Sequence, residues 1–561
     1  MKRDAVTLKL INEALRYSSE EMGLALRDAS YSPNIKERMD HSAAVFDERG
    51  RLLAQAEHIP VHLGSLPWGL SKLIGACERS GLDFEPGSML VSNNPYITGT
   101  HLNDITVMAP IHHGAQLVGF AVNKAHHSDV GGKVPGSIST DARTLQEEGL
   151  VLEPCYLRRG RRFVESTVTR VASGSRTPRE RKGDLRAQAA ANSTGEKRVL
   201  SLVSKYGLDD FRAAARTAFR SSEALTRKRL ARFGEGTYSA SDYLEAPDGS
   251  DLVLKAKVVI SGSGVLVDYS GSHKQVDYPL NAVFGVTISG AYFVLRCLLG
   301  DDIPANHGAF APVEVRAPVG SILNPTSPHP VGGGNVETSQ RNADVVFRAL
   351  AKAAPGRVPA AAGGSMNNVM VGGRWRGRQW AFYETIGVGL GGSRRADGID
   401  GIQCNMTNTL NTPIEELERS FPVLMTKYEF RPDSSGPGAH RGGSGIVRGY
   451  RMLAGTTFTA LADRGTHPPW GLEGGLPGRV TELFVSRRGS KEKVPVKVTL
   501  ALRPGDEVEV RTAGGGGFGD PDKRGTLEVS GDIQAGLVSS EEARKHYRLG
   551  RTKDVPRRER P

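Results

Sequence analysis

Cysteine is scarce in this sequence: its 561 residues include four, Cys77, Cys155, Cys297 and Cys404, and these lie far apart. No Cys-x-x-Cys pair occurs, which argues against a disulfide framework and against a zinc site built from thiolates. This cysteine usage is typical of a reducing compartment, so we expect a cytoplasmic protein.

Long apolar runs are missing too. No run of about 18 apolar residues occurs, so the sequence predicts no membrane span, and the N-terminal residues lack the apolar segment of a signal peptide. Aromatic residues make up 6% of the chain and do not interleave with the denser basic stretch at residues 176–186. The formal net charge of +12 therefore predicts a charged surface and no nucleic-acid partner.

Two familiar catalytic motifs are also absent. There is no Gly-x-x-x-x-Gly-Lys-Ser/Thr phosphate loop, and no Gly-x-Ser-x-Gly motif with a convincing catalytic triad. If the protein uses ATP, this sequence shows no familiar site for it.

Glycine, by contrast, is abundant, at 68 of 561 residues, and it clusters in short runs between apolar stretches. Such runs indicate many tight turns and close approaches of one backbone segment to another. The chain is also too long for one hydrophobic core. We therefore predict an α+β, multidomain, strand-rich protein with glycine-rich turns and with domains at residues 1–235, 236–345 and 346–561.

Helices are predicted near the N-terminus and at about residues 184–233. Leu8, Ile11, Leu15, Met22 and Leu26 recur at helical spacing, which predicts a first helix over about residues 7–29. The second helical stretch divides at Gly207, because glycine suits the position that follows a helix C-terminus.

Strands are predicted for most of the remaining chain. Residues 105–108 and 117–122 read as two strands paired around His113 and Gly114, and residues 252–269 read as a second hairpin. Residues 440–520 alternate short strands with glycine-rich turns. The C-terminal part is therefore predicted to be rich in β-structure.

Potential metal ligands are densest between residues 40 and 130. They form two groups that flank the first predicted hairpin, with one carboxylate upstream: His101 and Asp104; His126, His127 and Asp129; and Asp40. Because a hairpin returns its two ends to the same edge, the two groups can meet in space. Imidazole and carboxylate ligands together suit Zn²⁺, Mn²⁺ or Fe²⁺. The alternative is that these histidines are ordinary hydrogen-bonded groups of the core or surface.

Polar side chains mark two of the glycine-rich loops. Asn335 and Glu337 lie in the loop at residues 331–340, and Asn367 lies in the loop at residues 363–368. Such loops can bind a ligand through their backbone N–H groups. We predict that Asn335, Glu337 and Asn367 bind the substrate, although each loop taken singly can also be a plain turn.

A series of segments in a fixed order resembles the hydantoinase B/oxoprolinase family, and also the related subunits of acetone carboxylase and caprolactamase. The matching segments include Thr-His-Leu-Asn-Asp at 100–104, Ala-His-His-Ser-Asp at 125–129, Gly-Asn-Val-Glu-Thr-Ser-Gln at 334–340 and Gly-Gly-Gly-Gly-Phe-Gly-Asp-Pro at 514–521. Further matches lie at 32–42, 55–65, 183–188 and 436–445, so the resemblance covers nearly the whole chain. One departure is Asn103, where the family pattern has proline, and this changes the stiffness of the loop more than its ligands.

The resemblance implies a divalent metal, with Asp40, His101, Asp104 and His126 at the matching ligand positions. It also implies that ATP is used through an actin-like ATPase subunit. Since the sequence ends shortly after the glycine run at 514–517, we expect that subunit to be a separate protein and the assembly to be a hetero-oligomer. The family's hydrolases open cyclic amides such as hydantoins, 5-oxoproline and lactams.

The sequence therefore predicts the metal-dependent subunit of an ATP-dependent cyclic amidase, which is a hydrolase of carbon–nitrogen bonds. In the expected mechanism the metal acidifies a water molecule, and His127 or Asp129 acts as the general base or orients a ligand. Two alternatives stay open: a subunit of an ATP-dependent ketone carboxylase of the acetone type, and a non-catalytic structural partner of the ATPase subunit.

Overall fold

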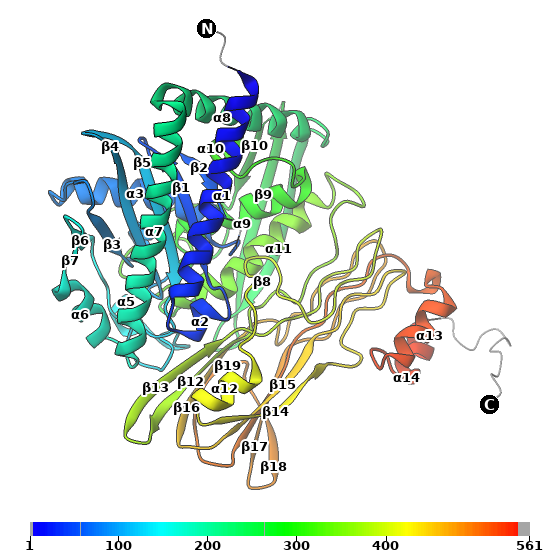
Figure 1. Ribbon diagram of the computed structural model, residues 1–561. Helices are drawn as coiled ribbons and strands as arrows, with labels where there is room; N and C mark the ends of the chain where they lie inside the picture. The colour runs from blue at the N-terminus through cyan, green and yellow to red at the C-terminus, as the bar shows by residue number, and fades with distance from the viewer. Residues whose placement is uncertain (1–3, 57, 263, 548–561) are drawn as a thin grey trace, which may run out of the picture.

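The computed structural model describes residues 4–56, 58–262 and 264–547 (Figure 1). Helices and strands are mixed along the chain, and the strands form four sheets in these ranges. This confirms the predicted α+β, multidomain class. None of the helices in these ranges combines the length and the apolar character that crossing a membrane requires.

The N-terminal part is built on a seven-stranded sheet. Its strands, in spatial order, are β2 (Leu52–Gln55), β1 (His41–Asp47), β5 (Gln116–His126), β4 (Asp104–His113), β3 (Met89–Ser92), β6 (Cys155–Arg159) and β7 (Arg162–Phe163). Strands β4 and β5 form the hairpin predicted from the sequence. Both strands are longer than predicted, so the pairing extends from His113 and Gln116 at the turn to Asp104 and His126 at the open end.

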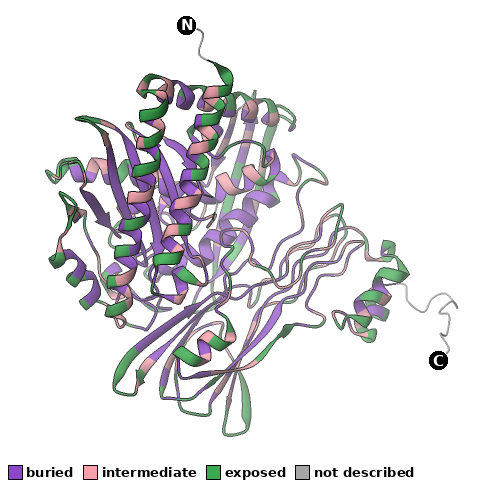
Figure 2. Ribbon diagram, in the orientation of Figure 1, coloured by how far each residue is buried: buried purple, intermediate pink, exposed green. Residues whose placement is uncertain are grey.

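Helices cover both faces of this sheet. On one face lie α1 (Ala5–Ala29) and α7 (Pro178–Tyr206), and on the other lies α3 (His62–Arg79) (Figure 1). Along β1, Val45 packs in the core with α1 and α7, whereas Ala44 and Phe46 pack with α3, because successive side chains of a strand point to opposite faces. Every residue of β1 is therefore buried, as the purple strands of Figure 2 show.

The predicted helical pair is confirmed, with slightly different limits. Helix α7 begins at Pro178, where proline suits the first turn because its missing N–H would have no partner there. It ends at Tyr206, and Gly207, with φ of 83°, leads into α8 (Leu208–Leu230). The smaller helices of this region are α2 (Pro33–Lys36), α4 (Pro95–Thr98), α5 (Leu145–Glu148) and α6 (Glu165–Ser173).

A second sheet shares its hydrophobic core with the first. Its strands, in spatial order, are β11 (Val313–Arg316), β10 (Gly264–Asp268), β9 (Asp251–Ser261) and β8 (Gly236–Glu245). The predicted hairpin at 252–269 is the β9–β10 pair, and residue 263 of its turn lies outside the described residues. Helices α9 (Phe284–Leu299) and α11 (Ser339–Leu350) pack between this sheet and α3. The predicted domain boundaries stay a prediction.

The C-terminal part contains the other two sheets and a second core. One sheet has the order β13 (Arg378–Glu384), β12 (Asn368–Trp375), β16 (Thr456–Leu461) and β19 (Lys497–Leu502). The other has the order β14 (Val423–Phe430), β15 (Ile446–Met452), β20 (Glu507–Arg511), β17 (Glu482–Arg487) and β18 (Ser490–Val494). The helices here are α12 (Ile414–Ser420), α13 (Thr526–Gln534) and α14 (Ser540–His546).

Five glycine-rich segments, at 389–392, 398–401, 436–443, 471–478 and 513–519, and the alanine-rich segment 360–363 together form what we call the glycine bundle. They run as extended ribbons toward α13 (Figure 1). The segment at 513–519 bonds to several others: Gly516 N donates to Ala361 O, Gly515 N to Gly443 O and Gly517 N to Leu476 O, while Gly392 N donates to Gly516 O. A β-strand has at most two hydrogen-bonded neighbours, so this is a bundle and not a sheet.

The glycine bundle explains why so many residues of this chain are glycine. A Cβ atom at Gly515 would lie 1.9 Å from the carbonyl oxygen of Leu390, and one at Gly389 would lie 1.8 Å from that of Gly443. The segments therefore approach one another at distances that only glycine allows. The sequence indicated close backbone approaches, but not that they join in one bundle.

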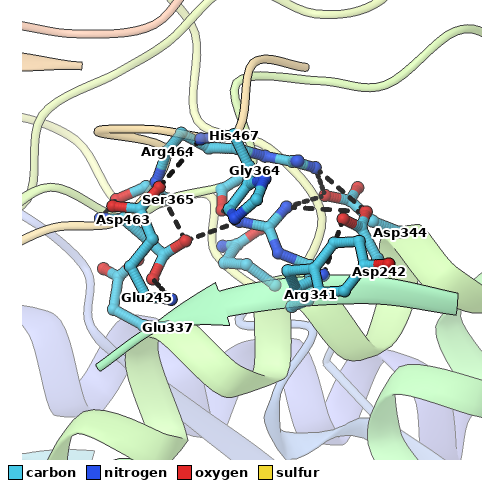
Figure 3. A network of polar contacts seen from close by, with 12 residues as sticks. Asp242, Glu245, Glu337, Arg341, Asp344, Gly364, Ser365, Asp463, Arg464 and His467 are labelled. Carbon is cyan, nitrogen blue, oxygen red and sulfur yellow. Dashed lines mark hydrogen bonds and ion pairs between the residues drawn. The ribbon is translucent and has the colours of Figure 1, made fainter. Parts of the chain in front are cut away.

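A buried ion network joins α11 to β8 and to the C-terminal part (Figure 3). Three cations meet three carboxylates there: Arg341 binds Asp344 and Asp463, Arg464 binds Asp344 and Asp242, and Lys497 binds Asp463. Because each charge has an opposite partner within hydrogen-bond range, the desolvation cost of burying it is offset. The network thereby fixes the position of α11, which follows directly on the residues of the predicted substrate loop.

Candidate metal centre

The open end of the β4–β5 hairpin brings three of the predicted ligands together. Asp104 and His126 are directly paired across the two strands, and His101 lies in the turn before β4, where its carbonyl accepts a hydrogen bond from the Asp104 N–H. All three residues are buried. The spatial meeting that the hairpin predicted is therefore present in the structure.

The three side chains offer one ligand atom each, at nearly equal separations. His101 Nε2 lies 3.2 Å from Asp104 Oδ1 and 3.1 Å from His126 Nδ1, and the last two atoms are 3.3 Å apart. Ligands about 2.0–2.1 Å from one zinc-sized ion stand about 3.0 Å apart at octahedral angles and about 3.4 Å apart at tetrahedral angles. The triangle thus fits one face of a metal coordination shell, and we refer to His101, Asp104 and His126 as the ligand triangle.

Two more side chains border the ligand triangle. Asp40, the fourth predicted ligand, places Oδ2 3.8 Å from His126 Nδ1, and Asn34 Nδ2 donates to the same oxygen over 3.4 Å. On the other side, His62 Nε2 lies 3.3 Å from Asp104 Oδ2, and His62 Nδ1 lies 2.9 Å from Ser42 Oγ. Asp40 can thus join the shell after a small movement, while His62 engages the second oxygen of Asp104.

The surroundings of the ligand triangle favour an ionised Asp104 and a neutral His126. Burial alone would raise the pKa of Asp104, but His101, His126 and His62 lower it by more, so the pKa lies well below its usual range. Burial lowers the pKa of His126. For His101, burial also lowers the pKa, but Asp104, Asp40 and Glu148 together raise it by more, so its pKa lies above the usual value. Ionised Asp104 and neutral His126 are the forms in which these groups bind a cation.

The C-terminal part completes the site with Tyr383 on β13. Its ring stacks on the His126 imidazole, with ring centroids 4.6 Å apart and an angle of 12° between the planes. The Arg38 guanidinium carbon lies 4.8 Å from the centre of the same tyrosine ring. Arg38 also donates to the Tyr383 carbonyl and to Asn34 Oδ1, which links Asp40 and His126 through one chain of contacts.

The sequence reasoning missed Asn34 and Tyr383, and it assigned no role to His62. His62 lies between Asp40 and His101, within the segment where potential ligands are densest, and this position is the signal that could have found it. Asn34 and Arg38 lie beside Asp40 in the segment 32–42, which matches the family pattern. No local signal points to Tyr383, because Arg38 contacts it across 345 residues of sequence.

His127 and Asp129 make their polar contacts outside the ligand triangle. His127 Nε2 lies 3.0 Å from Gln188 Oε1 on α7. Asp129 accepts from Arg176 Nη1 and from the backbone N–H groups of Gly131 and Gly136. These contacts fix the loop that follows β5, and the predicted catalytic role of the two residues stays a prediction.

The predicted substrate residues lie around the π-helical turn η1 (Gly334–Thr338), just before α11. The segment that carries Asn367 lies next to this turn, since Glu337 Oε1 accepts from the N–H of Met366, the neighbour of Asn367. Asn335, Glu337 and Asn367 are all buried, and Asn335 Oδ1, Glu337 Oε2 and Asn367 Oδ1 have no hydrogen-bond partner among the described residues. Buried polar atoms left free in this way are expected where a ligand binds.

The family model for hydantoinase B/oxoprolinase matches residues 4–521 of the chain. An uncharacterised protein of Methanocaldococcus jannaschii is 42% identical over 97% of this chain and 96% of its own length. The 5-oxoprolinase 1 of Arabidopsis thaliana is 34% identical over 92% of this chain, and the match spans 42% of that longer protein.

Two solved structures share the fold. The ATP-dependent caprolactamase of Pseudomonas jessenii superimposes with a TM-score of 0.90 at 29% identity, over 97% of this chain and 96% of that one. Acetone carboxylase in its nucleotide-free form also gives 0.90, at 19% identity, over 97% of this chain and 80% of that one, which shows the fold alone. With a family model matched over most of its length and a close relative of equal extent, the chain belongs to the hydantoinase B/oxoprolinase family.

Proposed function

We propose that this chain is the metal-dependent subunit of an ATP-dependent enzyme that opens cyclic amides. The observation that carries the proposal is the ligand triangle: three buried ligand atoms of His101, Asp104 and His126 separated by 3.1–3.3 Å, in a chain of the hydantoinase B/oxoprolinase family. A structural role alone does not explain why two imidazoles and a carboxylate meet in this way in a dry interior.

The donor set suits Zn²⁺, Mn²⁺ or Fe²⁺ held by His101, Asp104 and His126, with Asp40 as a fourth ligand. A divalent ion bound there would supply Lewis-acid chemistry, which activates water near neutral pH. Asn34 orients Asp40 through its amide, and His62 holds the second oxygen of Asp104. We assign His127 and Asp129 a positioning role: their contacts hold the loop that follows β5 and His126.

The substrate side of the site is assigned to Asn335, Glu337 and Asn367. A cyclic amide offers a carbonyl oxygen that accepts and, when unsubstituted, a ring N–H that donates. The free oxygens of Asn335 and Asn367 are acceptors for that N–H. Burial raises the pKa of Glu337 to about 8, with Asp463 adding to the rise, so near pH 7 its carboxyl group also carries a proton that it can donate to the amide oxygen.

A separate actin-like ATPase subunit would bind and hydrolyse ATP, and the two subunits would form a hetero-oligomer. The full-length likeness to a caprolactamase chain whose printed title calls it ATP-dependent supports this part of the proposal. In this arrangement the ATPase phosphorylates the amide oxygen, water adds to the activated carbon, and the C–N bond breaks as the ring nitrogen takes up a proton. A second water molecule then hydrolyses the resulting acyl phosphate and releases phosphate. A cytoplasmic site of action is consistent with the four cysteines, all of which are free thiols.

The test is metal content and ring opening of the purified complex with its ATPase subunit. We expect His101→Ala and Asp104→Ala to lose both bound metal and ATP-dependent opening of 5-oxoproline, hydantoin or caprolactam. His113→Ala is the matched control, because His113 is exposed at the opposite end of the same hairpin. Full metal occupancy with normal ring opening in both site variants would remove the proposal.

A ketone carboxylase of the acetone type is the second candidate, since acetone carboxylase shares the fold over 80% of its chain. The same purified complex separates the two functions. Bicarbonate-dependent ATP hydrolysis stimulated by acetone, without turnover of any cyclic amide, would favour the carboxylase.

A further inference from the structure

His126 differs from the other members of the ligand triangle because its ring rests on the C-terminal part of the molecule. Tyr383 on β13 stacks on the imidazole at 4.6 Å, whereas Asp104 and His101 are held within the N-terminal sheet and the turn before it. A stacked ring fixes the plane of the imidazole and hence the direction of Nδ1. The geometry of the triangle therefore depends on where Tyr383 lies.

Tyr383 is itself held by a second buried side chain. Its hydroxyl donates to Asn368 Oδ1 over 2.9 Å, and Asn368 Nδ2 donates to Glu337 Oε1 over 2.8 Å and to Leu461 O over 2.8 Å. Both ends of the Asn368 amide are thus in use, so the amide cannot rotate without breaking bonds in a buried place. Tyr383, Asn368 and Glu337 together form an unbroken line, which we call the relay.

Glu337 stands at the far end of the relay with one oxygen still free. Its Oε1 accepts from Asn368 and from the Met366 N–H, while Oε2 is buried and has no hydrogen-bond partner within the described part of the chain. Figure 3 shows Glu337 beside Ser365, at the edge of the ion network. It sits in the π-helical turn η1, a conformation that is frequent at functional sites.

We propose that Glu337, Asn368 and Tyr383 are positioning residues that set the orientation of His126, so that a ligand bound at Glu337 Oε2 and the geometry of the metal centre are coupled. This inference rests on the proposed metal centre. Glu337 uses one oxygen for the relay and presents the other to the ligand. A ligand that pulls on the free oxygen shifts the carboxyl group, and the shift passes through the Asn368 amide and the Tyr383 ring to the imidazole.

The test uses Co²⁺ alone with the full-length apo chain, because the visible absorption of bound Co²⁺ reports the geometry of its ligands. We expect Glu337→Ala and Tyr383→Phe to weaken Co²⁺ binding about 10-fold, as loss of a group that orients a metal ligand does, and to alter the visible bands. Tyr383→Phe keeps the stacked ring and deletes only the hydroxyl. Glu337→Gln is the matched control, and it should stay close to wild type because its amide oxygen can still accept from Asn368.

The results for the variants and for the wild type distinguish a failure of the relay from a failure of the metal centre. Wild-type affinity and an unchanged spectrum in both Glu337→Ala and Tyr383→Phe would overturn the relay, and so would a Glu337→Gln variant as weak as Glu337→Ala. A wild-type chain that binds no Co²⁺ would overturn the metal centre itself, and the relay with it. Circular dichroism of the apo proteins checks folding, and if Glu337→Ala does not fold, Tyr383→Phe carries the test.

Discussion

Replacing Gly515 by alanine tests the physical account of the glycine bundle. The added Cβ would meet the Leu390 carbonyl oxygen at 1.9 Å, whereas ordinary contact begins at 3.4 Å, so the two segments must separate by about 1.5 Å. Neither atom belongs to a flexible side chain. The backbone itself has to move.

A movement of that size breaks hydrogen bonds around residue 515. Gly392 N donates to Gly516 O over 2.8 Å between the two segments that must separate, and Gly443 bridges them, because it accepts from Gly515 N over 2.9 Å and donates to Leu390 O over 2.7 Å. These bonds would lengthen past their useful range. An unmade bond between buried groups costs about 1–3 kcal/mol. We expect Gly515→Ala to lower the free energy of unfolding by at least about 3 kcal/mol.

Urea unfolding followed by tryptophan fluorescence measures the effect, since Trp470 borders the bundle and its carbonyl accepts from Ala361 N. Gly531→Ala is the control: it lies within α13, and a Cβ there meets nothing within 4 Å, so alanine should be neutral or stabilising by up to about 1 kcal/mol. An unfolding midpoint for Gly515→Ala that matches the wild type would refute the reasoning. It would mean that the segments can separate at no cost and that glycine is not required there.

Three further predictions concern charges and metal. Arg448→Met should lower the free energy of unfolding by about 3–5 kcal/mol, because Arg448 Nε lies 2.8 Å from Glu384 Oε2, both side chains are fully buried, and the carboxylate would lose its cation. A smaller loss in urea unfolding for Arg448→Met than for Arg159→Met, which breaks an exposed pair, would contradict this prediction. Burial would raise the pKa of Glu509, but Lys427, Lys491 and Arg511 lower it to about 2 from an ordinary value of 4.5. The unfolded chain therefore binds the proton more readily, and the free energy of unfolding should fall as the pH drops from about 4.5 to 2. Urea unfolding at several pH values should show a weaker pH dependence in this range for Glu509→Gln. Removal of metal by a chelator should lower the thermal midpoint of the wild type, by the equivalent of about 2.7 kcal/mol at a metal concentration 100 times the Kd, and leave that of His101→Ala unchanged.

The parts of this structure that sequence reasoning reached are those with local signals. Helix α1 follows from the spacing of Leu8, Ile11 and Leu15, and the meeting of Asp104 with His126 follows from one hairpin. Tyr383 could not be found in this way, because its contact with His126 depends on how two different sheets pack against each other. The glycine runs indicated close contacts, but which segment lies against which is decided by long-range hydrogen bonds such as Gly392 N to Gly516 O.

Since glycine has no smaller substitute, every mutation of a glycine inside the glycine bundle can only add atoms. In an ordinary core, an enlarged side chain can be accommodated when a neighbour shrinks, and so sequences drift while volume is conserved. Between Gly515 and Leu390 the neighbour is a backbone carbonyl, which no mutation can shorten. A second mutation therefore cannot compensate for a larger residue at these glycines. A random library should recover active variants there far less often than in the two hydrophobic cores.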